Sequence, residues 1–136
     1  MPKVSQAHRQ MRQQQILEAA WRCFDRGGVQ ATTMQDIIAE SGLSASAMYR
    51  YFEDKEALIV AAITASLGAL GKLLQPIFDD VAIPGPAELA ARIAQRVDAF
   101  VASPGYDLRA IAIQGWGEAQ RNDDVHAAIS GFYAGF

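Results

Sequence analysis

The sequence predicts an all-α protein. Strand signals are almost absent, because β-branched residues are scattered and strict alternation of apolar and polar residues never lasts. Apolar residues instead return at helical spacing along the chain. Its 136 residues are 51% apolar and 20% charged, a length and composition that suit a globular domain and exclude a disordered chain.

The first helix is predicted over residues 13–28, QQQILEAAWRCFDRGG. Ile16, Ala20 and Phe24 recur every four residues and mark a buried face. Cys23 lies beside this face, where we interpret it as a small apolar filler. The glycine pair at 27–28 is typical of a helix C-terminus.

Two short helices follow. Thr33 and Asp36 have the spacing of a capping box, with Asp in place of the usual Glu or Gln, and Gly42 ends the helix that they begin. Ser44 then caps the next helix, whose Met48 is expected to pack on Leu43 as a hydrophobic staple. Two such helices joined by a turn that contains glycine make a helix-turn-helix.

The rest of the chain continues in helices. Asp54 begins a long fourth helix that is expected to fray near Pro76, and the linker IPGP at 83–86 follows. Three further helices are predicted over 87–103, around 108–116 and around 125–132. The chain ends in mid-pattern at ISGFYAGF, so we expect that more protein followed or that these residues pack on another chain.

Composition excludes several classes of protein. A single cysteine, Cys23, allows no internal disulfide, and two distant histidines make no metal cluster. The first fifteen residues lack the apolar core of a signal peptide, and no apolar run approaches the roughly 18 residues of a membrane span. We therefore expect a cytoplasmic protein that does not contact a membrane.

The net charge of −3 conceals an uneven distribution. Residues 1–50 hold six Lys/Arg and four Asp/Glu, a balance of +2, whereas residues 51–136 hold six and eleven, a balance of −5. A mildly basic first part is a weak indication of contact with a polyanion.

The chain from about residue 12 to residue 58 resembles the N-terminal domain of the tetracycline-repressor (TetR) family of bacterial regulators. The resemblance rests on many spaced positions, and the ordered set ends in YRYFEDKEAL. They are Ile16, Leu17, Ala19, Ala20, Phe24, Gly28, Thr32, Thr33, Ile37, Ala39, Ser41, Gly42, Leu43, Ser44, Met48, Tyr49, Tyr51, Phe52, Lys55 and Leu58. The stretch QGWGEAQRNDDV also looks like the sixth and seventh helices of family members, less specifically.

The resemblance implies a homodimeric, ligand-responsive transcription regulator, most often a repressor. Residues 1–54 would form the helix-turn-helix domain, which binds double-stranded DNA at a palindromic operator. Residues 55–136 would form part of a helical domain for dimerisation and for an unidentified small-molecule effector. Family members usually continue for several more helices, including the pair that forms the dimer interface, so the fold is expected to be truncated at its C-terminal end.

The third helix has the division of faces that a DNA-reading helix needs. At about 100° per residue, Met48 and Phe52 point into the core, whereas Ser46, Ala47 and Arg50 lie opposite them. Tyr49 and Tyr51 occupy the two flanks, where hydroxyl groups meet phosphates. The candidate DNA-binding residues are Thr33, Ser44, Ala45, Ser46, Ala47, Tyr49, Arg50, Tyr51 and Lys55.

Within this set, Arg50 is the candidate for direct readout, because a guanidinium pairs with guanine O6 and N7. Ala45 or Ala47 would touch a thymine methyl, and Thr33 and Lys55 would contact phosphates. Family members usually carry a basic or polar residue at Ala45 and glycine at Ser46, so readout leans on Arg50 and on DNA shape.

Each assignment has a structural alternative. Tyr49 and Tyr51 are alternatively half-buried packing residues, whereas Arg50 and Lys55 are alternatively solvated surface charges. Lys3, Arg9 and Arg12 are interpreted as a disordered tail in preference to a minor-groove arm. The candidate ligand contacts are Phe100, Tyr106 and Trp116, with the alternative that Trp116 belongs to the core.

Two rival functions are an enzyme and a helical interaction module. An enzyme is disfavoured, because no Ser/His/Asp set, metal-spaced cluster or glycine-rich phosphate loop follows a strand. No cofactor and no metal are therefore expected. The other rival is a helical interaction module that no longer binds DNA tightly.

Overall fold

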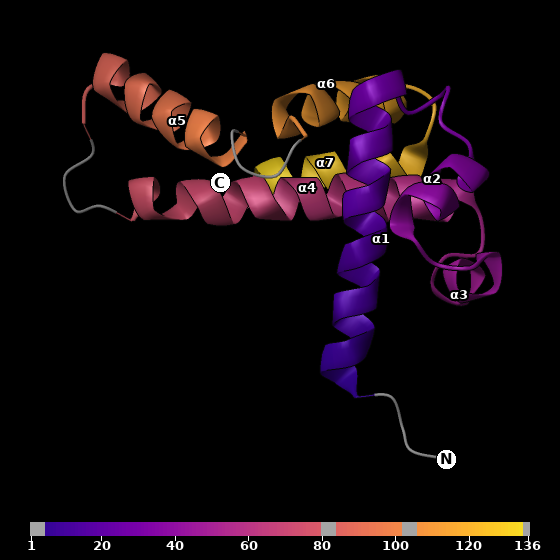
Figure 1. Ribbon diagram of the computed structural model, residues 1–136. Coiled ribbons are helices and arrows are strands. Elements are labelled where there is room, and N and C mark those ends of the chain that lie inside the picture. The colour runs from indigo at the N-terminus through magenta and orange to yellow at the C-terminus, as the bar shows by residue number, and fades with distance from the viewer. Residues whose placement is uncertain (1–4, 80–83, 102–105, 135–136) are drawn as a thin grey trace. The chain divides into compact units, whose positions relative to one another are not determined.

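The computed structural model describes residues 5–79, 84–101 and 106–134. These residues form seven α-helices and no strand, so the predicted all-α class is confirmed (Figure 1). The helices are α1 (Gln6–Gly27), α2 (Met34–Ser41), α3 (Ala45–Tyr51), α4 (Lys55–Phe78), α5 (Pro86–Val101), α6 (Leu108–Ala119) and α7 (Asp123–Ala134).

The chain divides into two compact units, residues 1–62 and 63–136. The division falls between Ala62 and Ile63, inside α4, whereas the sequence placed it at 54/55, before this helix. The first turns of α4 therefore belong with the helix-turn-helix, and the rest of α4 belongs with the second unit.

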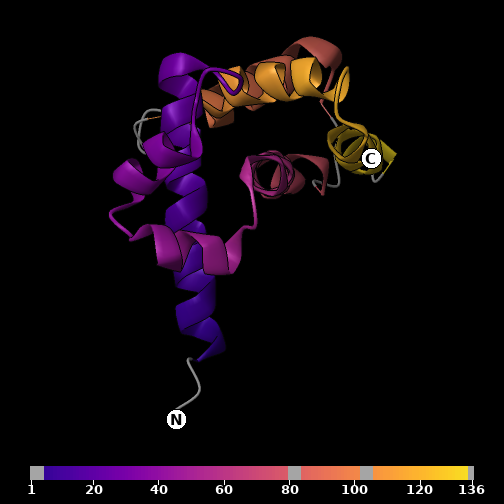
Figure 2. The same cartoon turned by 90° about the vertical axis from the view of Figure 1, so that its right-hand side faces the viewer.

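In the first unit, α1 is the long upright helix of Figure 1, and Figure 2 shows α3 running across its direction. The core of this unit is apolar and draws on every one of its helices. Its buried members include Ile16, Ala19, Ala20, Trp21, Phe24, Ile37, Met48, Phe52, Leu58 and Ile59. The predicted buried faces of the first three helices are thus confirmed.

Helix α1 begins earlier than the apolar pattern predicted. Ser5 caps it by accepting a 3.1 Å hydrogen bond from the backbone N–H of His8, and Arg9 and Arg12 lie within the helix. The interpretation of Arg9 and Arg12 as a disordered tail is therefore wrong, and Lys3 lies outside the described residues. The first turns of α1 carry no apolar stripe, but glutamine, arginine, methionine and alanine are strong helix formers.

In the second unit, small residues allow close approach between helices. A Cβ atom added at Gly115 of α6 would lie 3.2 Å from a methyl group of Ile63 on α4. A Cβ added at Gly71 would lie 3.3 Å from the ring of Phe132 on α7. Phe132 therefore packs within the chain, whereas the side chains of Tyr133 and Phe136 lie outside the described part.

Helix α4, which was expected to fray near Pro76, ends two residues beyond it. It continues to Phe78, and the N–H of Asp79 still donates to the carbonyl of Gln75 at 2.9 Å. Proline removes only its own N–H from the helical ladder, so the turn beyond it keeps its bonds.

The length and apolar composition of residues 55–77 in α4 would also suit a membrane span, contrary to the reading of the sequence. The core helix of a soluble protein has the same character. Leu58, Ile59 and Ala62, in the first turns, are fully buried within the protein.

Candidate nucleic-acid interface

Local capping bonds build the helix-turn-helix. Thr33 Oγ1 accepts from the N–H of Asp36 at 3.1 Å, and the Asp36 carboxylate accepts from the N–H of Thr33 at 2.9 Å. The predicted capping box is therefore confirmed, with Asp in the place of Glu. The bond from the backbone of Thr33 is the main reason that the pKa of Asp36 lies below its ordinary value.

The turn between α2 and α3 is also as predicted. Gly42 takes the left-handed conformation with φ of 75°, and Ser44 Oγ accepts from the N–H of Ala47 at 3.1 Å to cap α3. Glycine is favoured at such a position because it has no Cβ to clash with the backbone. The turn and cap set where α3 begins.

Helix α2 is held against α1 by polar contacts as well as by the core. Gln15 Nε2 donates to the carbonyl of Ser41 at 2.7 Å, and Glu40 bridges Arg22 at 2.8 Å and Arg26 at 3.0 Å. The hydrogen bonds from Arg26 and then from Arg22 hold the pKa of Glu40 below its ordinary value. These contacts fix the end of α2 that leads into the turn.

The three faces of α3 differ in exposure as the sequence predicted. Met48 is fully buried and Phe52 nearly so, whereas Ser46 and Arg50 are exposed. Ala45 is exposed and Ala47 partly so, and neither side chain extends past its methyl group. The outer face of α3 thus carries one long polar side chain, Arg50, among small residues.

The two flanking tyrosines are not equivalent. Tyr49 is 50% exposed, whereas Tyr51 is partly buried and lines a groove between α3 and α1. From the sequence, Tyr49 and Tyr51 were both predicted to contact phosphates through their hydroxyl groups. Half of the Tyr49 side chain is exposed, which suits both a phosphate contact and the half-buried packing alternative.

The remaining members of the predicted site lie beside the helix-turn-helix. Thr33 is exposed at the start of α2, and Lys55 is partly exposed in the first turn of α4. Lys55 Nζ donates to the carbonyl of Gln30 at 3.0 Å, so this ammonium also braces the loop before α2. An ammonium has three donors, and one such bond is compatible with a phosphate contact.

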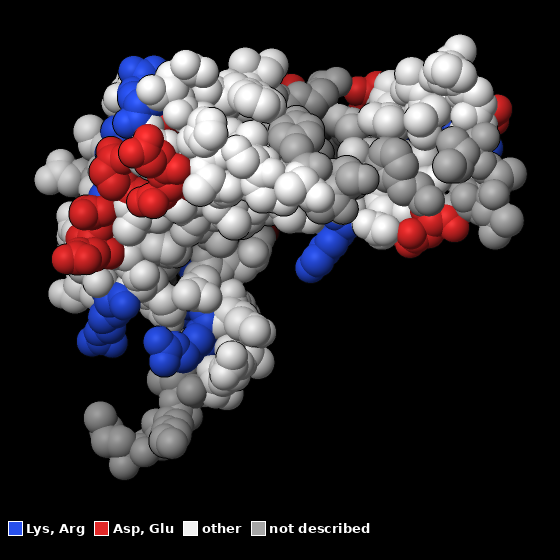
Figure 3. All heavy atoms as spheres, turned by 180° about the vertical axis from the view of Figure 1, so that it is seen from behind, with Lys and Arg blue, Asp and Glu red and all other residues white. Residues whose placement is uncertain are grey.

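The groove between α3 and α1 also contains His8, which was not among the candidate residues predicted from the sequence. The groove is lined by His8, Arg12, Leu43, Ala47, Arg50 and Tyr51. The sequence carried one usable signal: His8 and Arg12 are four residues apart, which places both on one face if this stretch is helical. Figure 3 shows Lys and Arg side chains on the lower part of the molecule.

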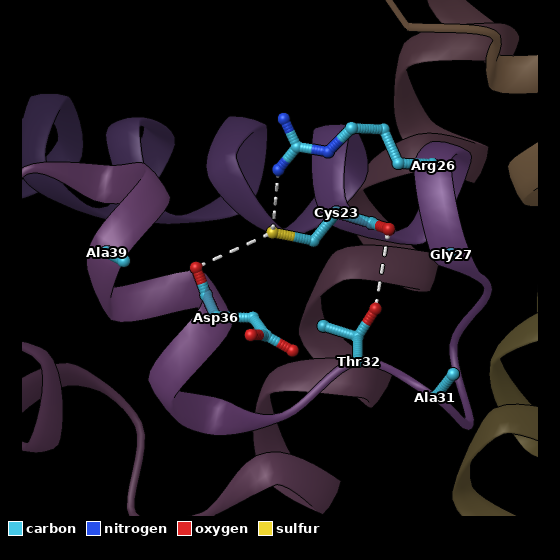
Figure 4. Close-up of a pocket in the computed structure, with 7 residues that line it drawn as sticks. All are labelled: Cys23, Arg26, Gly27, Ala31, Thr32, Asp36 and Ala39. Atoms are coloured by element: carbon cyan, nitrogen blue, oxygen red, sulfur yellow. Dashed lines mark hydrogen bonds between the residues drawn. The ribbon is translucent and has the colours of Figure 1, made fainter.

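Helices α1 and α2 and the loop between them line a second, open hollow of about 400 Å³, shown in Figure 4. The Cys23 thiol lies in it, donates to the carbonyl of Asp36 at 3.7 Å and accepts from Arg26 at 3.7 Å. Burial raises the pKa of this thiol and outweighs the lowering effect of Arg26. Cys23 is buried as expected, but its sulfur has polar partners, so it is more than an apolar filler.

The predicted ligand contacts are spread over the second unit. Tyr106 is buried, but Trp116 is 51% exposed, so the interpretation of Trp116 as a core residue is wrong. Phe100 belongs to α5, and its side chain lies outside the described part. An apolar groove of about 480 Å³ on α5 is lined instead by Ala90, Ile93, Ala94, Val97 and Asp98.

Comparison with known proteins places the helix-turn-helix in a family. Residues 16–62 match the family model described as bacterial regulatory proteins, tetR family. The chain is 41% identical over 61 residues to the HTH-type transcriptional repressor Rv1474c of Mycobacterium tuberculosis, covering 45% of this chain and 33% of that protein. It is 30% identical over 130 residues to the HTH-type transcriptional regulator BetI of Rhizobium meliloti, covering 95% and 61%.

The fold has solved counterparts as well. Salmonella enterica GusR superposes with a TM-score of 0.65 at 26% sequence identity, covering 98% of this chain and 65% of that chain. The chain thus spans less than two thirds of the length of each of these three proteins. The sequence match, the capped helix-turn-helix and the shared fold agree, and residues 16–62 therefore form a helix-turn-helix domain of the tetR family of bacterial regulatory proteins.

Proposed function

We propose that this chain is the DNA-binding part of a cytoplasmic transcription regulator, a ligand-responsive repressor that binds a palindromic operator as a homodimer. The observation that carries the proposal is the outer face of α3, where Arg50 is exposed among Ala45, Ser46 and Ala47. Small side chains allow the backbone of such a helix to approach base edges closely in the major groove. The regulatory class is that of the relatives, which are named as regulators and not as enzymes.

In this proposal each residue has one task. Arg50 pairs with guanine O6 and N7, and Ala45 or Ala47 contacts a thymine methyl. Phosphates are contacted by Thr33 and Ser44, which also cap their helices, and by Tyr49, Tyr51 and Lys55. Ser46 stays small so that the backbone approaches the bases.

The proposal also includes a dimer and an effector. A dimer suits a palindromic operator because two half-sites one helical turn apart match a two-fold axis. The effector would bind in the second unit, where Tyr106, Trp116 and Phe100 are the sequence-derived candidates. Trp116 has the exposed ring that a ligand or a further helix could cover.

The test begins with selection of binding sites from a random duplex library by the full chain, followed by measurement of affinity as a function of salt. A DNA-binding protein should lose affinity steeply as salt rises, and Lys55→Gln should reduce the slope of log K against log salt by about 0.9. Arg50→Ala should relax preference at one base position and cost about 1–3 kcal/mol there.

A matched control removes an exposed positive charge that lies outside the predicted DNA-binding residues. Lys72, exposed on α4 in the second unit, should tolerate Lys72→Gln with no change in slope or base preference. If Arg50→Ala weakens all sequences equally, Arg50 contacts only phosphate. Affinity that does not depend on salt would sink the proposal and favour the helical interaction module.

A further inference from the structure

The groove beside α3 is a second candidate binding site. It has a volume of about 190 Å³ and is formed entirely within the first unit, by the N-terminal turns of α1, the turn before α3, and α3 itself. Its lining residues are His8, Arg12, Leu43, Ala47, Arg50 and Tyr51.

The chemistry of the groove is that of an anion site. His8 and Arg12 lie one helical turn apart on α1, and Arg50 and Tyr51 face the same hollow from α3. Among the described residues that line it, none is Asp or Glu. Arg12 Nη1 donates to Gln15 Oε1 at 3.0 Å, which uses one of the five N–H donors of a guanidinium.

The position of the groove beside α3 indicates that the anion is a phosphate of the DNA backbone. An α-helix with its side chains is about 10–12 Å wide and the major groove of B-DNA is about 12 Å wide, so the flanks of an inserted helix meet the phosphates on both sides. The flank of α3 that carries Tyr51 is the one that opens on His8 and Arg12. A backbone phosphate on this side would therefore meet donors from α1 as well as from α3.

We propose that this groove binds a DNA backbone phosphate, with His8 as its pH-sensitive donor and Arg12 as its constant charge. The inference rests on the proposed DNA-binding function and adds a protonation step to it. Imidazole titrates near pH 6.5 in the absence of other influences, and only the protonated ring donates from both nitrogens and carries a charge.

The charged groups that share the groove with His8 favour a link between protonation of His8 and binding of a DNA phosphate. Arg12 comes from the same helix, Arg50 and Tyr51 from α3, and the turn contributes only apolar Leu43. A phosphate in the groove would favour a positive charge on the donors that face it. Binding of DNA should therefore take up a proton at His8.

The experiment measures the affinity of the full chain for its selected duplex across a salt series, at about pH 6 and about pH 7.5. Wild-type protein should bind about three- to tenfold more tightly at the lower pH, the size of one charge-assisted contact. Its salt slope should also be steeper there by about 0.9. Both differences should vanish in His8→Gln.

Two variants act as controls. His126→Gln changes the exposed histidine of α7, in the other unit, and should keep the full pH effect. Arg12→Gln should reduce the salt slope by about 0.9 at both pH values and leave the pH difference in place. Thermal unfolding of each variant should match that of wild type, because His8 and Arg12 lie outside the buried core.

The outcomes separate this site from the proposed function. Salt-dependent binding without a pH effect, or a pH effect that survives His8→Gln, overturns the groove and leaves the regulator intact. Binding with no salt dependence at either pH overturns the function itself. If inorganic phosphate at constant ionic strength shifts the His8 imidazole resonances while DNA affinity ignores His8, the groove takes a free anion and the DNA assignment fails.

Discussion

The indole Nε1 of Trp21 in α1 donates a 2.9 Å hydrogen bond to the backbone carbonyl of Ala62 in α4. Both residues are buried, and Ala62 is the last residue of the first unit. The bond thus ties α1 to the point at which α4 passes from one unit to the other. The first turns of α4, up to Ala62, belong to the same unit as the helix-turn-helix.

Trp21→Phe should lower the free energy of unfolding by about 1–3 kcal/mol, because it removes a buried hydrogen bond and part of a buried ring. Denaturant unfolding of the full chain measures this change in the free energy of unfolding. Trp116→Phe is the matched control, since Trp116 is 51% exposed and its replacement should change stability by no more than about 0.5 kcal/mol. Equal losses in the two variants would contradict this account of Trp21.

Gly42→Ala should destabilise the protein by about 1–2 kcal/mol, because Gly42 has φ of 75° and an L-residue is strained there. Nothing lies within 4 Å of the Cβ that would be added, so the cost comes from the backbone alone. Gly68→Ala also adds its methyl group to open space, but inside α4, where alanine is favoured by about 0.5–1 kcal/mol. Thermal unfolding should therefore shift in opposite directions for the two variants.

Glu40→Gln should reduce stability at neutral pH and abolish part of the acid sensitivity of the fold. Arg26 and Arg22 hold the pKa of Glu40 below its ordinary value near 4.5, so the folded state resists protonation of this carboxylate. Its stabilising effect is then complete above that value and is lost as the pH falls below it, through the lower pKa of the folded state.

Wild type and Glu40→Gln should therefore differ most in unfolding temperature above about pH 5 and converge in more acidic solution. Asp36, whose pKa is also lowered, is present in both proteins and contributes equally to each curve. A difference that stays constant down to about pH 2 would show that the two ion pairs do not stabilise the fold.

Cys23 should be slow to react with a disulfide reagent in the native protein. Its pKa is raised because burial disfavours the thiolate, which is the reactive form. We expect modification on the order of tenfold or more slower than that of glutathione at neutral pH, and ordinary reactivity after denaturation. Rapid native modification would mean that the Cys23 side chain, buried beside the hollow in Figure 4, readily becomes exposed.

The sequence by itself determined the local features of the helix-turn-helix. The Thr33–Asp36 capping box, the left-handed Gly42 and the Ser44 cap all depend on residues no more than three positions apart, or on the conformational freedom of a single glycine. The helical period likewise identified Met48 and Phe52 as the buried face of α3. Such interactions are readable because their partners lie within one helical turn.

Only the tertiary structure decided what depends on how helices pack. It distinguished Tyr51, which lines the groove with His8 and Arg12, from Tyr49, which is half exposed. It also placed the tryptophans differently, with Trp21 bonded to Ala62 and Trp116 half exposed. The helical period gives the direction of each side chain around its own helix. Which of these side chains contacts another helix is decided by how the two helices pack.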